Sequence, residues 1–528
     1  MEKTIDQRVE EVTYNRAKVW QLVLFALNNT STNIYLFAFM FITYFSTGVL
    51  GLAAIFVSQI MGYIRIFDGF IDPAIGIMID KTDTKFGKYR PILIAGNIIT
   101  ALSLILLLAL NNVSEGMRFP LFILVLIVHK IGYSMQQTIT KAGQTALTND
   151  PKQRPIFNIV DAVMLTTLMT GGQFVVSGFL VPKFGNFTLE FFNVLIYGTI
   201  VISAILGLLA VIGIWSKDNK EYFGLGENTQ KTELKDYMKV IKGNKPLQVL
   251  SIAAALVKFS VQFFGDSVVM VMLYGIVFGN YALSGQFSLL FVIPGVLINI
   301  LISSVARKKG LRFSYVASLQ FGLIALAAFG VVLYFGKVGD LSLSNINLYT
   351  ICFIITYMLA RYITQAPAGL VLTMGADISD YETSESGRYV SGMIGTIFSL
   401  TDSIASSFAP MVVGAVLATI GFAKAFPTME TPLTPELKMA TIILLVGIPF
   451  VALSVALFLM RFYKLDKEEM VRIQEKIQVM KAASSKERVK DIARNVPLSD
   501  MDYVDVTKYP VDKDWSFGRS WARCAQLF

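Results

Sequence analysis

Hydrophobic and polar residues alternate in long blocks along this chain. Apolar runs of about 20 residues recur almost from end to end, and short charged connections separate them. A helix of that length crosses the hydrocarbon core of a bilayer. The pattern therefore predicts an all-α polytopic membrane protein. Its twelve transmembrane helices are expected to start near residues 22, 53, 92, 119, 156, 193, 247, 284, 313, 346, 389 and 438.

Basic residues gather in alternate connections between the predicted spans. One such loop holds Lys81, Lys85, Lys88 and Arg90. Because positive residues near the ends of spans remain in the cytoplasm, these connections and both termini are predicted to be cytoplasmic. The predicted organisation is an N-terminal segment 1–21, a six-helix half 22–216, a central cytoplasmic loop 217–246, a second six-helix half 247–463 and a C-terminal tail 464–528.

The composition supports a membrane setting and excludes several classes of protein. Hydrophobic residues make up 54% of the chain, charged residues 16%, and the mean hydropathy is +0.59. These values exclude an ordinary soluble globule. The net charge of +9 is explained by the cytoplasmic loops, so no nucleic-acid partner is expected. With two cysteines and one histidine, His129, the chain offers no metal cluster or nucleophile, and neither an enzyme nor a cofactor is expected.

Polar residues inside the spans follow a period of three helices. Spans three, six, nine and twelve contain no charged residue and are expected to face lipid. Spans one, four, seven and ten carry polar stripes at helical spacing, and such stripes are typical of a central cavity between inverted triple-helix repeats. The stripes comprise Asn28, Asn29, Thr32 and Asn33; Lys130, Ser134, Gln137 and Lys141; Lys258, Gln262 and Asp266; and Arg361, Thr364 and Gln365.

Span two carries the most informative charges. Arg65, Asp68 and Asp72 lie at i, i+3 and i+7 and share one face. Each ionised carboxylate in the membrane costs about 2.5 to 3.5 kcal/mol or more, which favours a bound cation. Pro73 frees the carbonyl of Gly69, so the turn predicts an oxygen site for a small hard cation or for one shared proton. The alternative is that Arg65 simply neutralises Asp68.

The same span carries a resemblance to a known family. It reads R-x-x-D-x-x-x-D-P-x-x-G and continues to Asp80 and G-K-Y-R-P. Residues 376–388 read ADISDYETSESGR, and the last span ends in RFYKLDKEEMVRIQ. Over residues 22–480 the chain resembles the glycoside-pentoside-hexuronide:cation symporters, the melibiose permease-like family of the major facilitator superfamily.

The resemblance implies a symporter that imports a sugar or glycoside with Na⁺ or H⁺ by alternating access. The expected cation-binding residues are Asp68, Asp72, Gly69 and Ser134. A cytoplasmic gate is expected from Asp80, Lys81, Gly87, Lys88 and Arg90 in the first half and Asp377, Asp380 and Arg388 in the second. The alternative for the gate residues is that their charges only set the topology.

The chain also departs from the family pattern. Ile71 stands where an asparagine precedes the second cation aspartate, which puts sodium selectivity in doubt. The family's sugar-binding acids fall at Thr32 and Gln137, its helix-four aromatic at Lys141, its helix-five arginine near Asp161 or Ala162 and its helix-eleven lysine at Ser403. The predicted substrate-binding residues are Thr32, Asn33, Tyr133, Gln137, Lys141, Lys258, Asp266, Arg361, Asp402 and Ser403.

Loss of two acids and gain of three lysines make the interior more receptive to an anion. Acidic glycosides such as hexuronides or glucuronides are therefore the first expectation, unless Asp161, Asp266 and Asp402 pair with those lysines. A lipid or lysolipid transporter on the same fold and a nontransporting sensor are the alternatives. The expected setting is the lipid bilayer of a bacterial plasma (inner) membrane, and a monomeric state is left open.

Overall fold

The computed structural model describes residues 15–82, 84–148, 150, 153–219, 241–387 and 391–480. Apart from an isolated bridge between Thr84 and Gly87, the regular structure of these residues is helical. The long helices of the first half are α2 (Val19–Phe39), α4 (Ala54–Lys81), α5 (Arg90–Ala109), α6 (Glu115–Leu147), α7 (Arg154–Val175) and α9 (Leu189–Ile214). Short helices α3 (Ile42–Tyr44) and α8 (Val181–Phe184) extend α2 and α7.

The second half repeats this order with more bends. Its helices are α11 (Lys245–Gln262), α12 (Ser267–Met270), α13 (Ala282–Leu290), α14 (Val292–Lys309), α15 (Leu311–Phe335), α16 (Leu348–Ser386), α17 (Ser391–Thr419), α18 (Pro435–Ile442) and α19 (Ile448–Leu459). The helix α11 bends by 45° into α12, and α13 bends by 44° into α14. Residues 467–480 form a further helix after the last span.

The described helices account for the predicted spans. Eight of them are long and apolar enough to cross a membrane, or ten when each bent pair counts as one span. The helices α4 and α16, with 28 and 39 residues, are also long enough and carry charged residues in their interior. With these two, the described residues supply the twelve helices expected, each beginning within a few residues of its predicted start.

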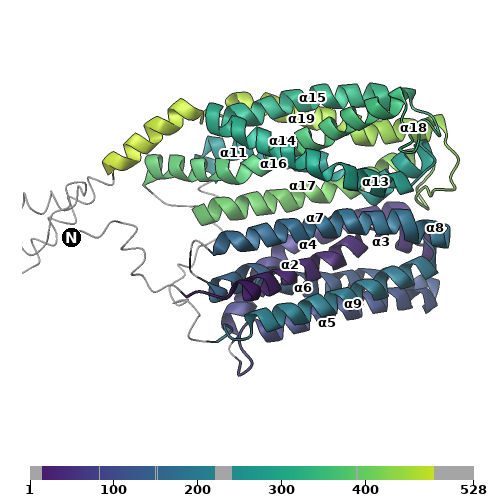
Figure 1. The fold of residues 1–528 in the computed structure, drawn as a ribbon, viewed down its shortest axis with the longest axis horizontal. Coiled ribbons are helices and arrows are strands. Elements are labelled where there is room, and N and C mark those ends of the chain that lie inside the picture. The colour runs from purple at the N-terminus through teal and green to yellow at the C-terminus, as the bar shows by residue number, and fades with distance from the viewer. Residues whose placement is uncertain are drawn as a thin grey trace, which may run out of the picture.

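The helices form two bundles that lie side by side (Figure 1). One bundle contains α2 to α9 and the other α11 to α19, and α4 packs against α17 where they meet. This crossing is close because small residues line it. A side chain on Gly62 would collide with Ser407 and Met411, and one on Gly414 would collide with Ser58. The glycines therefore let two charge-bearing helices approach each other at the centre of the molecule.

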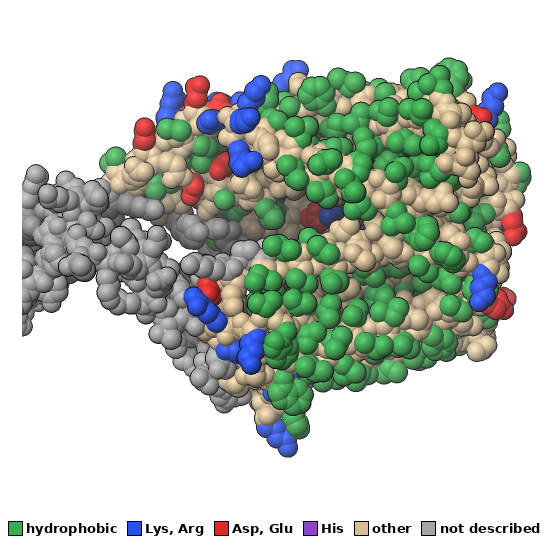
Figure 2. Space-filling model, in the orientation of Figure 1, with side chains coloured by type: hydrophobic (Ala, Val, Ile, Leu, Met, Phe, Trp, Pro, Cys, Tyr) green, Lys and Arg blue, Asp and Glu red, His purple; other side chains and the backbone are tan. Residues whose placement is uncertain are grey.

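Apolar side chains cover the outer flanks of both bundles (Figure 2). Strongly exposed examples come from α5, α9, α15 and α19, the helices predicted to face lipid: Leu102, Leu208, Ile324 and Val451. Between the bundles, Figure 2 shows a hollow in which acidic and basic side chains lie. Apolar outer flanks, with the charged side chains confined to a hollow between the bundles, are the pattern that a lipid solvent requires.

The two ends of the molecule differ in charge and in how the halves meet. One end, here called the basic face, carries Arg16, Arg90 and Arg312 and the helix 467–480. At the other end, the closed face, hydrogen bonds join the halves. The hydroxyl of Tyr44 donates to the carbonyl of Pro427 at 3.1 Å. The amide of Ala54 donates to the carbonyl of Lys424 at 3.0 Å.

Candidate functional site

The two intramembrane aspartates of α4 face two polar residues of α6. Lys130 Nζ lies 2.7 Å from Asp68 Oδ2, and the hydroxyl of Ser134 donates to Asp72 Oδ1. Within each helix the two residues are one turn apart, so the contacts form two rungs of a ladder. The ladder brings both predicted cation carboxylates against α6, Asp68 on Lys130 and Asp72 on Ser134.

The contact between Lys130 and Asp68 is a largely buried ion pair that was not predicted from the sequence. The Lys130 side chain is 9% exposed and that of Asp68 is 26% exposed. The ammonium also lies 5.2 Å from the centre of the Tyr133 ring, a favourable cation–π distance. The preceding residue, His129, is buried, exchanges a 2.9 Å hydrogen bond with Ser103 and stacks on Phe39. His129 therefore packs this turn of α6 against the neighbouring helices.

Arg65 does not make the contact with Asp68 that the sequence left open. Its Nη1 donates to the carbonyl of Ser406 on α17 at 2.8 Å, so it links the halves. The guanidinium also interacts electrostatically with Asp68, Asp266 and Asp402. Arg65 thus lies between acids of both halves, while Lys130 makes the short contact with Asp68.

Gly69 and Ile71, which lie between Asp68 and Asp72 on α4, have apolar neighbours. Gly69 lies against the side chain of Leu400 on α17. Ile71 is 8% exposed and belongs to a buried cluster with Met135 and Ile139. The position of the family's asparagine is therefore part of the hydrophobic core of the first half. It supplies no oxygen to a cation at Asp68 and Asp72.

The second half carries its own lysine–aspartate pair. Lys258 Nζ lies 3.1 Å from Asp402 Oδ2, and the pair lines a cavity of about 240 Å³ between α11, α16 and α17. Ala368 and Phe398 give this cavity apolar walls, and Ser251 and Thr401 add hydroxyls. Ser403 is partly buried next to the pair, and its carbonyl accepts a hydrogen bond from Ser406. A cavity with apolar walls and a few polar groups is suited to a small polar molecule.

Asp266 does not continue the stripe of Lys258 and Gln262, and this prediction was wrong. The helix α11 ends at Gln262, and the 45° bend follows before α12 begins. Asp266 is the N-cap of α12, where its carboxylate accepts from the amides of Val268 and Val269 at 2.9 and 3.2 Å. A helical period cannot be extended through a break in the helix.

Arg361 lies in a tyrosine-rich part of α16. Its Nη1 donates to the hydroxyl of Tyr357 at 3.4 Å, and its guanidinium is 5.8 Å from the centre of the Tyr362 ring. The phenol of Tyr274 also interacts with it. Among the described residues no carboxylate lies within ion-pair distance of Arg361. The group can therefore receive a polar or anionic partner.

The predicted residues of α2 and the rest of α6 differ in accessibility. Thr32 is fully buried and its hydroxyl donates to the carbonyl of Asn28, so Thr32 does not reach the surface of the hollow in this structure. Asn33 donates to Asn29 Oδ1 at 2.9 Å. On α6, Gln137 donates to the hydroxyl of Tyr133 at 3.2 Å, and Lys141 is exposed.

The loop after α4 is held by a residue that the sequence analysis missed. Asp218, fully buried after α9, accepts from the amides of Lys88, Tyr89 and Arg90 at 2.8 to 3.1 Å. It also pairs with Arg90 Nε at 3.1 Å, and that guanidinium lies 4.4 Å from the Trp215 ring. Asp218 caps the N-terminus of α5 from the segment that follows α9. The acid directly after an apolar span was the available signal.

Other gate residues are engaged within their own half. Gly87 has φ +99°, which lets the loop turn its next three amides toward one carboxylate. On α16, Asp380 accepts from Gln474 at 2.7 Å, and Glu385 pairs with Lys476 at 2.9 Å. Asp377 lies one turn before Asp380. Lys81 is exposed at the end of α4, whereas Arg388 and the side chain of Asp80 lie outside the described residues.

Within the described part of the chain there is no group of three or more His, Cys, Asp or Glu residues that could hold a metal ion in the manner of a metalloenzyme. Asp68 and Asp402 are each paired with one lysine instead. The arrangement of the site is that of an ion-paired interior between two helix bundles.

Comparison with known proteins adds an independent result. A family model described as "MFS/sugar transport protein" matches residues 28–467. The putative glycoside/cation symporter YagG of Escherichia coli is 23% identical over 470 residues, covering 89% of this chain and 96% of that protein. The isoprimeverose transporter of Lactiplantibacillus pentosus is 23% identical and covers 81% and 85%. The crystal structure of the nucleoside transporter NupG superposes with TM-score 0.59 at 14% identity, covering 84% and 99%, which shows a shared fold.

Proposed function

We propose a function from the premise that the chain belongs to the MFS/sugar transport protein family. It is a membrane transporter and not an enzyme. The proposed activity is secondary active symport of a sugar or glycoside with Na⁺ or H⁺ by alternating access. The single observation that carries it is the α4–α6 ladder, which holds Asp68 and Asp72 against the polar face of α6. Carboxylates placed at this depth are suited to coupling with a cation.

The arrangement of the two ends supports alternating access. Hydrogen bonds join the halves at the closed face, such as Tyr44 to Pro427. At the basic face, Asp218 and Arg90 engage each other in the first half, and Asp380 contacts Gln474 in the second. We assign the basic face to the cytoplasm by the positive-inside rule, so the conformation is inward-facing. The assigned setting is the plasma membrane of a bacterium, with both termini cytoplasmic.

A sugar or glycoside fits the polar groups around the hollow. Gln137 and Tyr133 on α6 and the pair of Lys258 and Asp402 offer both donors and acceptors for hydroxyl groups. Lys130 and Lys258 are each neutralised by an aspartate, which removes much of the positive field expected from the sequence. Arg361 and Lys141 are then the cations available to the carboxylate of a hexuronide or glucuronide.

Uptake into proteoliposomes tests this function. The purified chain is reconstituted and given radiolabelled neutral and acidic glycosides under imposed Na⁺ or proton gradients. Gradient-driven accumulation is expected for at least one glycoside, and Asp68→Asn and Asp72→Asn are expected to abolish it. Glu115→Gln, which removes an exposed acid at the opposite end of α6, is the matched control. Full accumulation in both aspartate variants would rule out the proposed coupling site.

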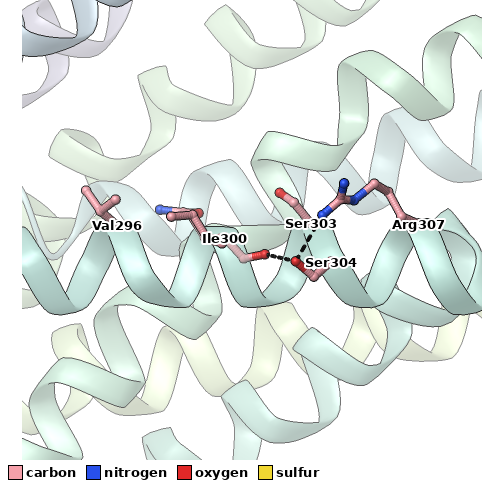
Figure 3. Close-up of a pocket in the computed structure, with 6 residues that line it drawn as sticks. Val296, Ile300, Ser303, Ser304 and Arg307 are labelled. Atoms are coloured by element: carbon pink, nitrogen blue, oxygen red, sulfur yellow. Dashed lines mark hydrogen bonds between the residues drawn. The ribbon is translucent and has the colours of Figure 1, made fainter.

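A groove on α14 favours an amphiphile as the second candidate cargo. Figure 3 shows Val296, Ile300, Ser303, Ser304 and Arg307 along one stretch of this helix, and Asn299 completes the lining. The groove has about 410 Å³ and passes from apolar side chains to the Arg307 guanidinium, which donates to Ser304 at 3.4 Å. A lysophospholipid belongs in the same uptake panel. Its transport without transport of any glycoside would replace the sugar assignment with a lipid one.

A further inference from the structure

We propose that Lys130 is a built-in cation of the α4–α6 site and that it excludes sodium, so that transport by this chain does not require Na⁺. The inference rests on the proposed function where it concerns transport, but its sodium-binding test does not depend on that function. Of the two coupling ions left open by the sequence, the inference removes one. Lys130 is thereby assigned as the residue that determines ion selectivity.

The first step is the position of the ammonium. Lys130 Nζ is 2.7 Å from Asp68 Oδ2, the distance of a charge-assisted hydrogen bond. The side chain is nearly buried and is held on its other side by the Tyr133 ring. A second monovalent cation bound to Asp68 would lie within a few ångströms of this charge. In a partly desolvated site, like charges at that distance repel each other strongly.

The second step is the supply of oxygen ligands. Hard cations need several oxygens at once. One oxygen of Asp68 is engaged by Lys130, and the hydroxyl of Ser134 is directed to Asp72. Ile71, on the same turn of α4, lies in the hydrophobic core and supplies none. With Lys130 on Asp68 and Ile71 in the core, the site offers a sodium ion fewer oxygens than the family motif would.

The third step is that the two other basic side chains, Arg65 and Lys258, have partners of their own. Arg65 donates to the Ser406 carbonyl across the interface between the halves. Lys258 is paired with Asp402 in the second half. Removing Lys130 would therefore leave Asp68 without its close partner, in surroundings where an ionised carboxylate requires one. A sodium ion from solution could then take the vacated position.

Equilibrium binding of ²²Na⁺ to the purified full-length chain in detergent tests the inference without any glycoside. The unmutated chain is expected to show no saturable binding. Lys130→Ala is expected to gain saturable sodium binding. Lys130→Arg, which keeps the charge, is expected to bind no sodium. Lys183→Ala is the control, because it removes an exposed lysine on α8, outside the α4–α6 site, and should change nothing.

A double variant ties the gained ion to the site. Asp68→Asn combined with Lys130→Ala should lose the sodium binding that Lys130→Ala alone gained. Should Lys130→Ala fail to elute as a monodisperse species, Lys130→Gln keeps most of the side-chain volume and replaces it.

Two results would overturn the inference: saturable sodium binding by the unmutated chain, or a folded neutral variant at position 130 that binds none. Absence of glycoside uptake under every gradient would instead overturn the proposed function and leave the sodium result standing.

Discussion

The two halves of the molecule each contain a lysine–aspartate pair, and the pairs differ in their surroundings. In the first half, Lys130 and Asp68 have side chains 9% and 26% exposed. In the second, Lys258 and Asp402 are 36% and 49% exposed and line a cavity. The difference in exposure suits the two pairs to different purposes. A buried pair fixes charge at one place, whereas an exposed pair can exchange its partner for a hydroxyl or a carboxylate of the cargo.

The largest expected effect comes from breaking the buried pair. Asp68→Asn leaves Lys130 charged and nearly buried, so the free energy of unfolding should fall by about 3 to 5 kcal/mol. Chemical unfolding in detergent measures the change. Replacing both partners together, with Asp68→Leu and Lys130→Met, should recover most of the loss because no charge is then left unpaired. No recovery in the double variant would show that the ion pair is not the cause.

A smaller loss of stability is expected from a change at Asp218, which is fully buried at the basic face. Asp218→Asn keeps one carbonyl oxygen for an amide but loses the ion pair with Arg90, which predicts a cost of about 2 to 3 kcal/mol. Hydrogen exchange should accelerate at the amides of Lys88, Tyr89 and Arg90. Asp340→Asn, an acid near the other end of the molecule, is the control. Unchanged exchange at these three amides would contradict the proposed cap.

The exposed pair should matter for cargo and little for stability. Asp402→Asn is expected to change the free energy of unfolding by no more than about 1 kcal/mol, since exposed ion pairs contribute little. Once a transported glycoside is known, its KM should rise about tenfold, the loss of one hydrogen bond to a charged group. A change in kcat alone would place Asp402 outside the binding site.

The smallest expected effect is that of ionic strength. Salt screens exposed charges more than buried ones, so added KCl should raise the KM for an acidic glycoside. The dependence should be weaker in Asp402→Asn and Lys258→Ala together, because the pair no longer contributes. The stability of the detergent-solubilised chain should change little over the same range, since Lys130 and Asp68 are shielded. A KM independent of salt would show that the cavity pair does not contact the cargo.

The helices could be predicted from the sequence because membrane thickness sets their length. The apolar runs gave starts such as 53 and 389, close to Ala54 and Ser391. The shared face of Lys130 and Ser134 followed from their spacing. Their partners did not, because a shift of α6 by one turn along α4 would have paired Lys130 with Asp72 instead. That register depends on packing between helices distant in the chain.

Asp266 and Asp218 show two further limits. A helical stripe is a reliable guide only while the helix continues, and the break after Gln262 turned Asp266 into a cap. Asp218 fell in the predicted loop 217–246, where an acid is ordinarily solvated. Its burial results from the return of the loop after α4 to the end of α9, a contact between residues about 130 positions apart.

That contact also constrains how the protein can be made. The N-terminal amides of α5 are satisfied by Asp218, which is synthesised 130 residues after Lys88. Until the sixth span leaves the ribosome, the G-K-Y-R loop therefore has no cap, and α5 begins with open amides at the membrane surface. The cap of α5 can therefore form only after the last helix of the first half, α9, has been synthesised.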